Sequence, residues 1–381
     1  MGILQMIQPR SELRVLWYTP SIDVSAGGVS SCLQQVAAHL GRRVQLHVVT
    51  HRSANMLPMD NCTLHFLSGS QLFPWASKRE FVHILTEVAP DVVHTNSCWE
   101  PLDAYCLLWA HSRGLATVYT LHGMMEPFIM RRHYWMRKVP ALAVYQGRAL
   151  RAADRVVATS ARERDNFIAL GYNSKVTVIP NCIQLDGISL KTDWTVRRTI
   201  LYLSRLHPVK GIERMLEAVA AIQSALVGYR VVIAGSGEPA YVASLQAMTH
   251  RLGIAHLVDF KGHVAGDAKW ALYRSADFLV LPTNTENFGM VVAESLSVGT
   301  PVITTKGAPW EELDTQACGL WVDISTAAIS HAIETMIGKT ATQLEQMGRN
   351  GRALVERKYA AHHVAEMMVD MYTQVINPIN R

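Results

Sequence analysis

Two carboxylates, Glu286 and Glu294, stand eight positions apart in the segment 282–296, PTNTENFGMVVAESL. The apolar run Phe278–Leu281 before it is predicted as a buried strand, and Met290–Val298 as the following helix. Glu286 therefore lies in the loop at the carboxyl end of a strand, and Glu294 follows roughly 12 Å further on, at about 1.5 Å per helical residue. Carboxylates that act together on one glycosidic bond stand only about 5–9.5 Å apart, so this spacing favours contact with two ends of one extended ligand. The alternative is a pair of solvated acids at a helix start, a weak explanation for Glu294 inside an apolar helix.

Two cations follow the predicted strand Thr199–Leu203, in the segment 204–211, SRLHPVKG. Arg205 offers a planar fork of N–H donors for phosphate oxygens, and Lys210 adds a point charge from the same loop. The lysine precedes a glycine that opens a predicted helix, and this arrangement favours binding of a diphosphate. The alternative is two ordinary surface cations.

Glycines follow two further predicted strands. Gly27 and Gly28 precede the predicted helix Val29–Leu40, and Gly235 begins a Gly-Ser-Gly turn after Val231–Ala234. Glycine lets the backbone approach a phosphate, and the N–H groups of a helix N-terminus can bind it. A simple tight turn is the alternative in each case. The second turn is not a full dinucleotide fingerprint, and no acid follows about 20 residues later to bind a ribose, so a nicotinamide cofactor is not expected.

His122 follows the predicted strand Thr117–Thr120, in the sequence Leu-His-Gly. A histidine at a strand end can donate a hydrogen bond to a substrate hydroxyl or stabilise charge in a transition state. An ordinary loop histidine is the alternative, because the chain holds 16 histidines.

All of these residues follow short β-branched or aromatic runs that alternate with helical patterns, which is typical of a parallel α/β architecture. The predicted strands are residues 14–18, 45–49, 92–94, 117–120, 155–158 and 176–179, then 199–203, 231–234, 258–260, 278–281 and 302–304. Residues 185–194 lack periodicity and are interpreted as an interdomain linker. We therefore expect Rossmann-like domains over residues 1–184 and 195–359, with ligands at the carboxyl ends of their strands.

The bulk properties agree with this organisation. A chain of 381 residues suggests two or three domains, and 49% hydrophobic with 18% charged residues is typical of a globular protein. No apolar run approaches the roughly 20 residues that span a bilayer, and the N-terminal sequence does not have the order of a signal peptide, so we expect a cytoplasmic protein. The net charge of +5 favours anionic partners such as a nucleoside diphosphate or an acidic membrane surface, and is too small to indicate nucleic acid. The six cysteines show no metal-binding spacing and are expected to be reduced core residues.

The Glu-x7-Glu pair and the loop with Arg205 and Lys210 resemble the motifs of the retaining nucleotide-sugar glycosyltransferases of the group 1 or family 4 type, which include sucrose synthase and bacterial lipopolysaccharide glucosyltransferases. The resemblance extends over residues 12–375. It implies the GT-B fold, an α/β architecture in which two Rossmann-like domains face each other across a cleft and the last helix, within residues 360–381, packs back on the first domain. It also implies transfer of a hexose from a UDP- or GDP-sugar to a carbohydrate or lipid-linked carbohydrate acceptor, in the assembly of surface polysaccharide or lipopolysaccharide.

The resemblance implies a role for each motif. Glu286 would bind hydroxyls of the donor sugar, Glu294 the nucleotide ribose, and Arg205 with Lys210 the diphosphate, whose charge they would offset as the nucleotide leaves. His122 would lie close to the anomeric centre. Further contacts would come from the backbone at Gly27, Gly28, Gly235, Phe288, Gly289 and Met290. The chain has no Asp-x-Asp sequence, the metal-chelating motif of the other main class of glycosyltransferases, so neither a metal nor a cofactor is expected.

The acceptor would bind the first domain. Segment 126–151 interleaves aromatic and apolar residues with cations, and such a stretch can lie on an anionic bilayer, here the inner face of the plasma membrane. Pro140 interrupts it, so an ordinary helix pair with a solvated basic face remains an equal alternative. Four residues after another predicted strand are candidates to line the acceptor pocket: His94, Asn96, Trp99 and Glu100.

Two positions depart from the resembled pattern or lack a role. Gln184 stands where many relatives have an acid, and Trp310, in the segment KGAPWEE, is assigned nothing beyond stacking or core packing. Two rival functions remain, a nucleotide-sugar epimerase of the same fold and a non-catalytic subunit that binds a nucleotide sugar. The order of the motifs argues against the epimerase, and the presence of Arg205, Lys210, Glu286 and Glu294 together argues against the inert subunit.

Overall fold

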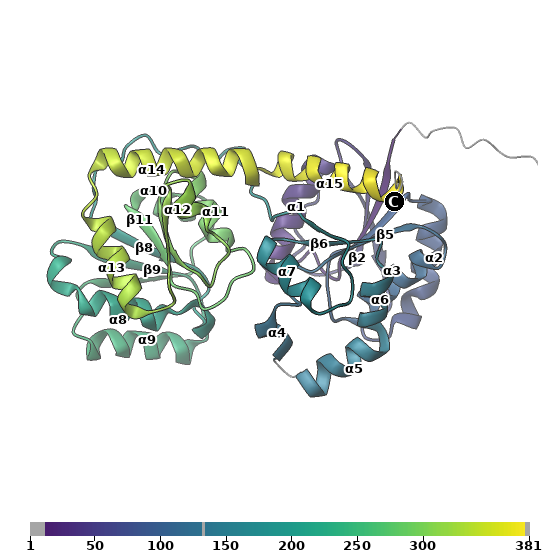
Figure 1. The fold of residues 1–381 in the computed structure, drawn as a ribbon, viewed down its shortest axis with the longest axis horizontal. Coiled ribbons are helices and arrows are strands. Elements are labelled where there is room, and N and C mark those ends of the chain that lie inside the picture. The colour runs from purple at the N-terminus through teal and green to yellow at the C-terminus, as the bar shows by residue number, and fades with distance from the viewer. Residues whose placement is uncertain (1–11, 132–133, 378–381) are drawn as a thin grey trace, which may run out of the picture. The chain divides into compact units, whose positions relative to one another are not determined.

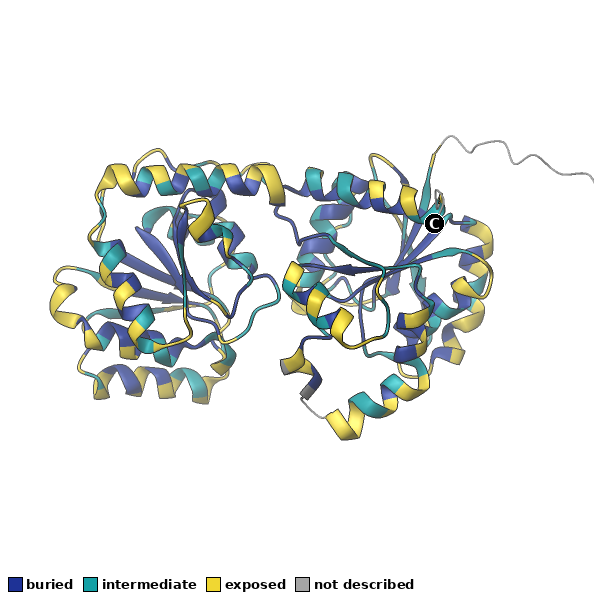
Figure 2. Cartoon of the chain, viewed as in Figure 1, coloured by how far each residue is buried: buried dark blue, intermediate teal, exposed yellow. Residues whose placement is uncertain are grey.

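The computed structural model of the chain describes residues 12–131 and 134–377. The chain forms two compact units: the N-terminal unit runs to Cys182 and takes in the chain from Ala361 onward, and the C-terminal unit is Ile183–Ala360. Each unit is a parallel sheet covered by helices (Figure 1). The central strands of both sheets are buried, the edge strands are partly exposed, and the exposed residues lie mainly on helices and loops (Figure 2).

Within the described residues, the N-terminal sheet has seven strands in the order β3-β2-β1-β4-β5-β6-β7, all paired in parallel. The strands are β1 Arg14–Tyr18, β2 Gln45–His51, β3 Thr63–Leu67, β4 Val92–Thr95, β5 Ala116–Thr120, β6 Arg155–Ala158 and β7 Val176–Val178. The main helices are α1 Gly28–Leu40, α2 Pro74–Val88, α3 Pro101–His111, α4 Pro127–Arg131, α6 Gly147–Ala152, α7 Ala161–Ala169 and α15 Ala361–Ile376. Two π-helical turns, Tyr134–Lys138 and Leu142–Gln146, flank the short α5 Val139–Ala141.

Helices cover both faces of this sheet because successive strand residues point to opposite sides. On β1, Val15 and Trp17 join the core formed with α1 and α15. Leu16 and Tyr18 join a separate core formed with α2 and α3. Strands buried on both faces read as continuous apolar runs, which is why the sequence pattern predicted them.

The described C-terminal sheet has six parallel strands in the order β10-β9-β8-β11-β12-β13. They are β8 Thr199–Leu203, β9 Arg230–Ala234, β10 Val258–Gly262, β11 Phe278–Leu281, β12 Val302–Thr305 and β13 Gly319–Val322. The helices of this unit are α8 Ile212–Ala221, α9 Pro239–Arg251, α10 Gly266–Ser275, α11 Met290–Ser297, α12 Glu312–Thr315, α13 Thr326–Ile337 and α14 Ala341–Leu354.

The predicted parallel α/β architecture is confirmed, and two strands were not predicted. Both β3 and β13 lie at sheet edges, where a strand has only one neighbour and a weaker apolar pattern. The segment interpreted as a linker, 185–194, packs on the C-terminal unit: Trp194 is buried and its indole N–H donates to the carbonyl of Gly299 at 2.9 Å. In the part of the chain that the structure describes, no helix is both long and apolar enough to cross a bilayer.

Candidate functional site

Each sheet reverses its strand order beside its first strand. In the C-terminal unit β8 lies between β9 and β11, and in the N-terminal unit β1 lies between β2 and β4. Loops that leave neighbouring strands in opposite directions open a crevice at the carboxyl ends of the strands, and ligands of open α/β sheets bind there. Lys210 and Glu286 stand on the loops after β8 and β11, so they flank this point in the C-terminal unit.

The two loops are joined by hydrogen bonds. The backbone N–H of Asn284 donates to the carbonyl of Val209 at 2.8 Å, and the hydroxyl of Thr283 donates to the same carbonyl at 3.2 Å. Gly211, with a φ of 68°, packs so closely that a Cβ there would lie 2.2 Å from the carbonyl oxygen of Pro282. Only glycine fits this contact, which brings the start of α8 against the end of β11.

Lys210 and Glu286 form an ion pair between these loops, with Nζ donating to Oε2. The side chains are 13% and 18% exposed, respectively. The sequence placed both residues at strand ends, and the structure brings them into direct contact. A cation and an anion are therefore held side by side at the carboxyl edge of the sheet, where a ligand with both phosphates and hydroxyls could bind.

The turn after Glu286 is held by aromatic packing. The indole N–H of Trp310 donates to the carbonyl of Phe288, and the two rings lie 5.2 Å apart, centre to centre. Tyr359 packs on both, 4.9 Å from Trp310 and 5.3 Å from Phe288. Gly289, with a φ of 85°, ends the turn and caps α11, which begins at Met290. The stacking or core packing expected for Trp310 is confirmed, and the hydrogen bond to Phe288 adds a role that the sequence did not predict: Trp310 positions the turn.

Glu294 lies on α11 and already has two partners on α10. Its carboxylate accepts a hydrogen bond from the hydroxyl of Tyr273 at 2.8 Å and pairs with Nζ of Lys269 at 2.9 Å. Each carboxylate oxygen can accept more than one hydrogen bond, so both contacts leave capacity for ribose hydroxyls. Neither α10 residue was singled out in the sequence, because nothing in its spacing links it to Glu294.

The remaining predicted residues of this unit differ in their setting. Arg205 is exposed, and its guanidinium has no partner among the described residues. Gly235 lies against the same loop, where a Cβ would stand 1.9 Å from the carbonyl oxygen of Ser204. Its N–H donates to the carbonyl of Gly262 at 2.7 Å, so this amide serves the fold and is not directed to a ligand. Among the described side chains, no cluster of three or more His, Cys, Asp or Glu could hold a metal ion.

In the N-terminal unit, Gly27 caps α1 with a φ of 73°, and Gly28 is the first helical residue. A Cβ at Gly27 would meet no atom within 4 Å. The glycine is therefore required by its backbone conformation and leaves open space at the helix N-terminus, where an anion can approach.

His122 follows β5 with a φ of 48°, a strained conformation for a residue with a side chain. Its two ring nitrogens are buried and have no hydrogen-bond partner among the described residues. Burial lowers the pKa of His122 to about 4. A neutral imidazole with one donor and one acceptor unused is suited to hydrogen bonding with a sugar hydroxyl.

A buried carboxylate holds the loop that carries His122. Glu163 on α7 accepts hydrogen bonds from the backbone N–H of Gly123, and from the N–H and hydroxyl of Thr159 at 2.6 and 2.9 Å. Burial raises the pKa of the Glu163 carboxyl. This residue joins the ends of β5 and β6 and was not identified in the sequence, where it resembles any surface acid in the first turn of a helix.

The expected role of His94 in an acceptor pocket is not supported by its position. His94 is fully buried, with Nδ1 2.6 Å from the hydroxyl of Tyr372 and Nε2 2.6 Å from the hydroxyl of Thr120. The same Tyr372 hydroxyl accepts from the indole N–H of Trp17 at 2.9 Å. His94 therefore ties α15 to the sheet, and Asn96 is also buried.

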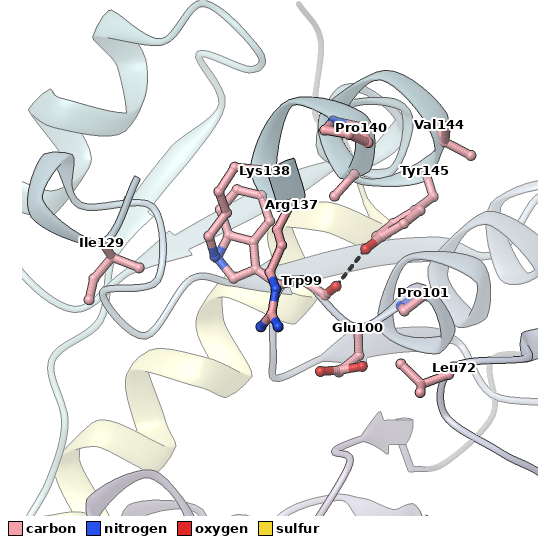
Figure 3. Close-up of a pocket in the computed structure, with 11 residues that line it drawn as sticks. Leu72, Trp99, Glu100, Pro101, Ile129, Arg137, Lys138, Pro140, Val144 and Tyr145 are labelled. Carbon is pink, nitrogen blue, oxygen red and sulfur yellow. Dashed lines mark hydrogen bonds between the residues drawn. The ribbon is translucent and has the colours of Figure 1, made fainter. Parts of the chain in front are cut away.

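Trp99 and Glu100, in contrast, line a cavity of about 800 Å³. Its other walls come from the segment 137–145 and from Leu72 and Ile129 (Figure 3). The indole N–H of Trp99 donates at 2.9 Å to the carbonyl of Met124, in the loop that carries His122. The cavity is therefore joined directly to that loop.

Comparison with known proteins identifies the family. The sequence model described as Glycosyl transferases group 1 matches residues 192–354, and the model described as Glycosyltransferase Family 4 matches residues 26–186. Together they cover most of both units, including the loops with Lys210, Glu286 and His122.

Curated relatives match over part of their length. The chain is 31% identical over 186 residues to an uncharacterized glycosyltransferase of Methanocaldococcus jannaschii, covering 48% of this chain and 47% of the relative. It is 29% identical over 250 residues to a GDP-mannose-dependent α-(1-6)-phosphatidylinositol dimannoside mannosyltransferase of Mycobacterium tuberculosis, covering 61% of each. The chain thus spans about half to three fifths of the length of these relatives.

Solved structures share the fold. A sucrose-phosphate synthase of Thermosynechococcus elongatus superposes with a TM-score of 0.76 at 19% identity, over 95% of this chain and 99% of the other. HepE of Anabaena, in complex with UDP-glucose, superposes with a TM-score of 0.74 at 19% identity, over 94% and 99%. The superpositions show that the chain has the GT-B fold. The two family matches, which together span most of residues 26–354, show that the chain belongs to the glycosyltransferases of the group 1 and family 4 type.

Proposed function

We propose that the chain is a retaining, metal-independent glycosyltransferase that moves a hexose from a UDP- or GDP-sugar to a carbohydrate or lipid-linked carbohydrate. The observation that carries this proposal is the Lys210–Glu286 ion pair at the point where the C-terminal sheet reverses its strand order. Such a pair can bind the two halves of a sugar phosphate, because the ammonium attracts the phosphate and the carboxylate accepts from sugar hydroxyls.

The donor would extend over the surface of the C-terminal unit. Arg205 and Lys210 bind the diphosphate, Glu286 the sugar and Glu294 the ribose. In the N-terminal unit, the ring nitrogens of His122 have no hydrogen-bond partner among the described residues, so this imidazole has donor and acceptor capacity for a sugar hydroxyl. The names of similar proteins agree with a donor of this class, since one relative is GDP-mannose-dependent and one structure holds UDP-glucose.

In the proposed step, the bond between C1 of the sugar and the phosphate oxygen breaks, and a bond forms between C1 and an acceptor hydroxyl oxygen. The acceptor proton passes to the leaving phosphate, and the nucleoside diphosphate departs. Arg205 and Lys210 supply the positive charge that a metal supplies in other transferases, which is the basis for proposing metal independence. Retention of the anomeric configuration follows from the resemblance of the Glu-x7-Glu motif.

We also propose that the N-terminal unit contacts an anionic membrane at the inner face of the plasma membrane, during assembly of surface polysaccharide or lipopolysaccharide. Trp135 and Met136 are 79% and 81% exposed, and Arg137 follows them directly. Leu72, Phe73 and Trp75 are also exposed. Large exposed apolar side chains beside cations are suited to an anionic bilayer surface.

Donor turnover tests the proposed activity. The full chain is incubated with UDP-, GDP- and ADP-sugars without acceptor, with and without EDTA, and release of nucleoside diphosphate is measured. We expect slow hydrolysis of one donor that persists in EDTA and is lost in Glu286→Ala and Lys210→Ala. Release of an epimerised sugar would instead indicate an epimerase. Donor binding without turnover, here and in a repeat with added acceptors, would indicate an inert subunit. A rate that only Mg²⁺ or Mn²⁺ restores would indicate a metal-dependent enzyme.

A further inference from the structure

We propose that the cavity beside Trp99 binds a lipid phosphate, with the alkyl or isoprenyl chain along its apolar wall and the phosphate at Arg137 and Lys138. The volume of about 800 Å³ lies in the range of small-molecule sites. Identification of this lipid phosphate as the anchor of the acceptor sugar rests on the proposed function. Binding of the lipid phosphate itself can be measured independently of sugar transfer.

The wall formed by Trp99 is strained and firmly held. Trp99 has a φ of 84°, which is rare for a residue with a large side chain. Its backbone N–H donates to the Gln146 side chain at 3.0 Å, and its carbonyl accepts from the Tyr145 hydroxyl at 2.6 Å. With the indole bond to Met124, three hydrogen bonds maintain this conformation. Strain that the surrounding structure maintains in this way is typical of binding sites.

Two cations line the cavity beside Trp99. Nζ of Lys138 lies 3.5 Å from the centre of the Trp99 ring, and Arg137 reaches beside it (Figure 3). The guanidinium of Arg137 forms no ion pair with any described residue. Burial lowers the pKa of Lys138 to about 8, so an anion that replaces lost solvation would stabilise its charged form. Among the described residues, Glu100 is the one acid that lines the cavity, and it takes part in the capping box that starts α3.

The rest of the lining suits a hydrocarbon chain. Leu72, Ile129, Pro140 and Val144 line the cavity from three separate segments, and Leu72 and Val144 are 64% and 58% exposed. Of the polar groups on the described walls, the Tyr145 hydroxyl and the Trp99 indole N–H already donate to backbone carbonyls. The combination of an aliphatic surface with two adjacent cations therefore favours a lipid phosphate over a free carbohydrate.

The cavity also lies beside the loop that carries His122. Trp99 follows β4, next to β1 in the sheet, and its indole is bonded to the loop of His122. A lipid phosphate bound at Arg137 and Lys138 would leave its sugar to extend along this loop. The cavity would thus select the anchor, and the loop would select the reacting hydroxyl.

Binding of decyl phosphate to the full chain, below its critical micelle concentration, tests the proposal by titration calorimetry. We expect wild type to bind, and Val144→Glu to bind at least about tenfold more weakly because it sets an anion in the apolar wall. Val227→Glu is the matched control: Val227 is 75% exposed, lies in the C-terminal unit and does not line the cavity, so its binding should equal that of wild type.

Arg137→Ala tests recognition of the phosphate group. Its control is Arg148→Ala, at an exposed arginine outside the cavity. Arg137→Ala should weaken decyl phosphate and leave decanol unaffected. Absence of decyl phosphate binding, or equal binding by Val144→Glu and Val227→Glu, would overturn the proposal, as would a cavity that binds maltose and not decyl phosphate. Donor hydrolysis by wild type is measured in parallel, and its absence would contradict the proposed function without touching the lipid phosphate site.

Discussion

Lys210 and Glu286 stand 76 positions apart in the chain and form an ion pair at the carboxyl edge of one sheet. Each is presented by a loop that follows a buried strand, and the two strands are neighbours at the point where the sheet reverses direction. Both side chains are largely buried, so screening by solvent is reduced and loss of one partner leaves the other charge poorly compensated.

The first prediction concerns Lys210→Met. In the proposed step the Lys210 ammonium binds the leaving diphosphate, so we expect its removal to lower donor turnover by about 100-fold or more. Lys261→Met is the control, because Lys261 also pairs with an acid, Asp259, in the same unit but on the edge strand β10. Equal loss in both variants would indicate a general effect of charge and contradict the assigned role.

The second prediction concerns Glu163→Gln. A carboxylate accepts from both Gly123 and Thr159, whereas the amide nitrogen of glutamine would face one of these N–H donors. We expect kcat to fall by about tenfold or more with little change in the donor KM. Glu126→Gln is the control. Glu126 lies on the loop of His122 and accepts a hydrogen bond from Asn166, and its substitution should have little effect on kcat.

A double-mutant cycle separates positioning from general stability. If Glu163 acts by holding His122, the double variant His122→Ala/Glu163→Gln should be no slower than His122→Ala alone. Fully additive losses would show that Glu163 acts by another route.

The third prediction concerns Trp310→Phe, which keeps a ring but removes the indole donor to the Phe288 carbonyl. We expect a loss of about 1–2 kcal/mol in stability and a clear loss of donor turnover. Trp194→Phe is the matched control, because its buried indole donates to the carbonyl of Gly299 away from the Glu286 turn. Trp194→Phe should lose a similar amount of stability but retain donor turnover. If both variants lost turnover equally, a specific role for Trp310 would be contradicted.

The fourth prediction concerns pH and His94. Burial is the main cause that lowers the pKa of His94 to about 3, from 6.5 for an exposed imidazole. Between these two pKa values His94 stays neutral in the folded state but takes up a proton in the unfolded state. The stability that neutral His94 contributes is therefore complete above pH 6.5 and is lost as the pH drops toward 3. Each pH unit in this window removes about 1.4 kcal/mol. Burial also lowers the pKa of His122, so this residue likewise makes the fold less stable as the pH falls.

Thermal unfolding between pH 7.5 and 5 measures this effect. His94→Gln should be less stable than wild type at pH 7.5, because it disrupts the bonds to Tyr372 and Thr120, but its stability should fall less steeply as the pH drops. His111→Gln, at an exposed histidine, should retain the slope of wild type. A slope unchanged by His94→Gln would contradict the account.

The sequence predicted what depends on local pattern. Buried parallel strands are apolar along their whole length, so β8 and β11 could be recognised, and with them the loops of Lys210 and Glu286. The contact between these two residues could not be predicted, since it depends on strand order. The same holds for Lys269 with Glu294 and for Glu163 with Gly123, where the partners lie on different elements.

His94 shows the opposite error. A histidine at a strand end was interpreted as a ligand-binding residue, but the end of a strand near a sheet centre can also be covered by a distant helix. Here α15 brings Tyr372, 278 positions away, into hydrogen-bonding distance. A single histidine gives no sign of such a partner in sequence.

The central claim is sugar transfer by a site built on Lys210 and Glu286, and one NMR experiment tests it most directly. The full chain is incubated with α-linked nucleoside diphosphate sugars and an alkyl-phosphate-linked monosaccharide, and the anomeric protons are followed with nucleotide release. The account predicts nucleoside diphosphate and a new α-glycoside in equal amounts with wild type, and neither with Lys210→Met or Glu286→Ala. A β-glycoside, a free epimerised sugar, or transfer that survives both substitutions would contradict it.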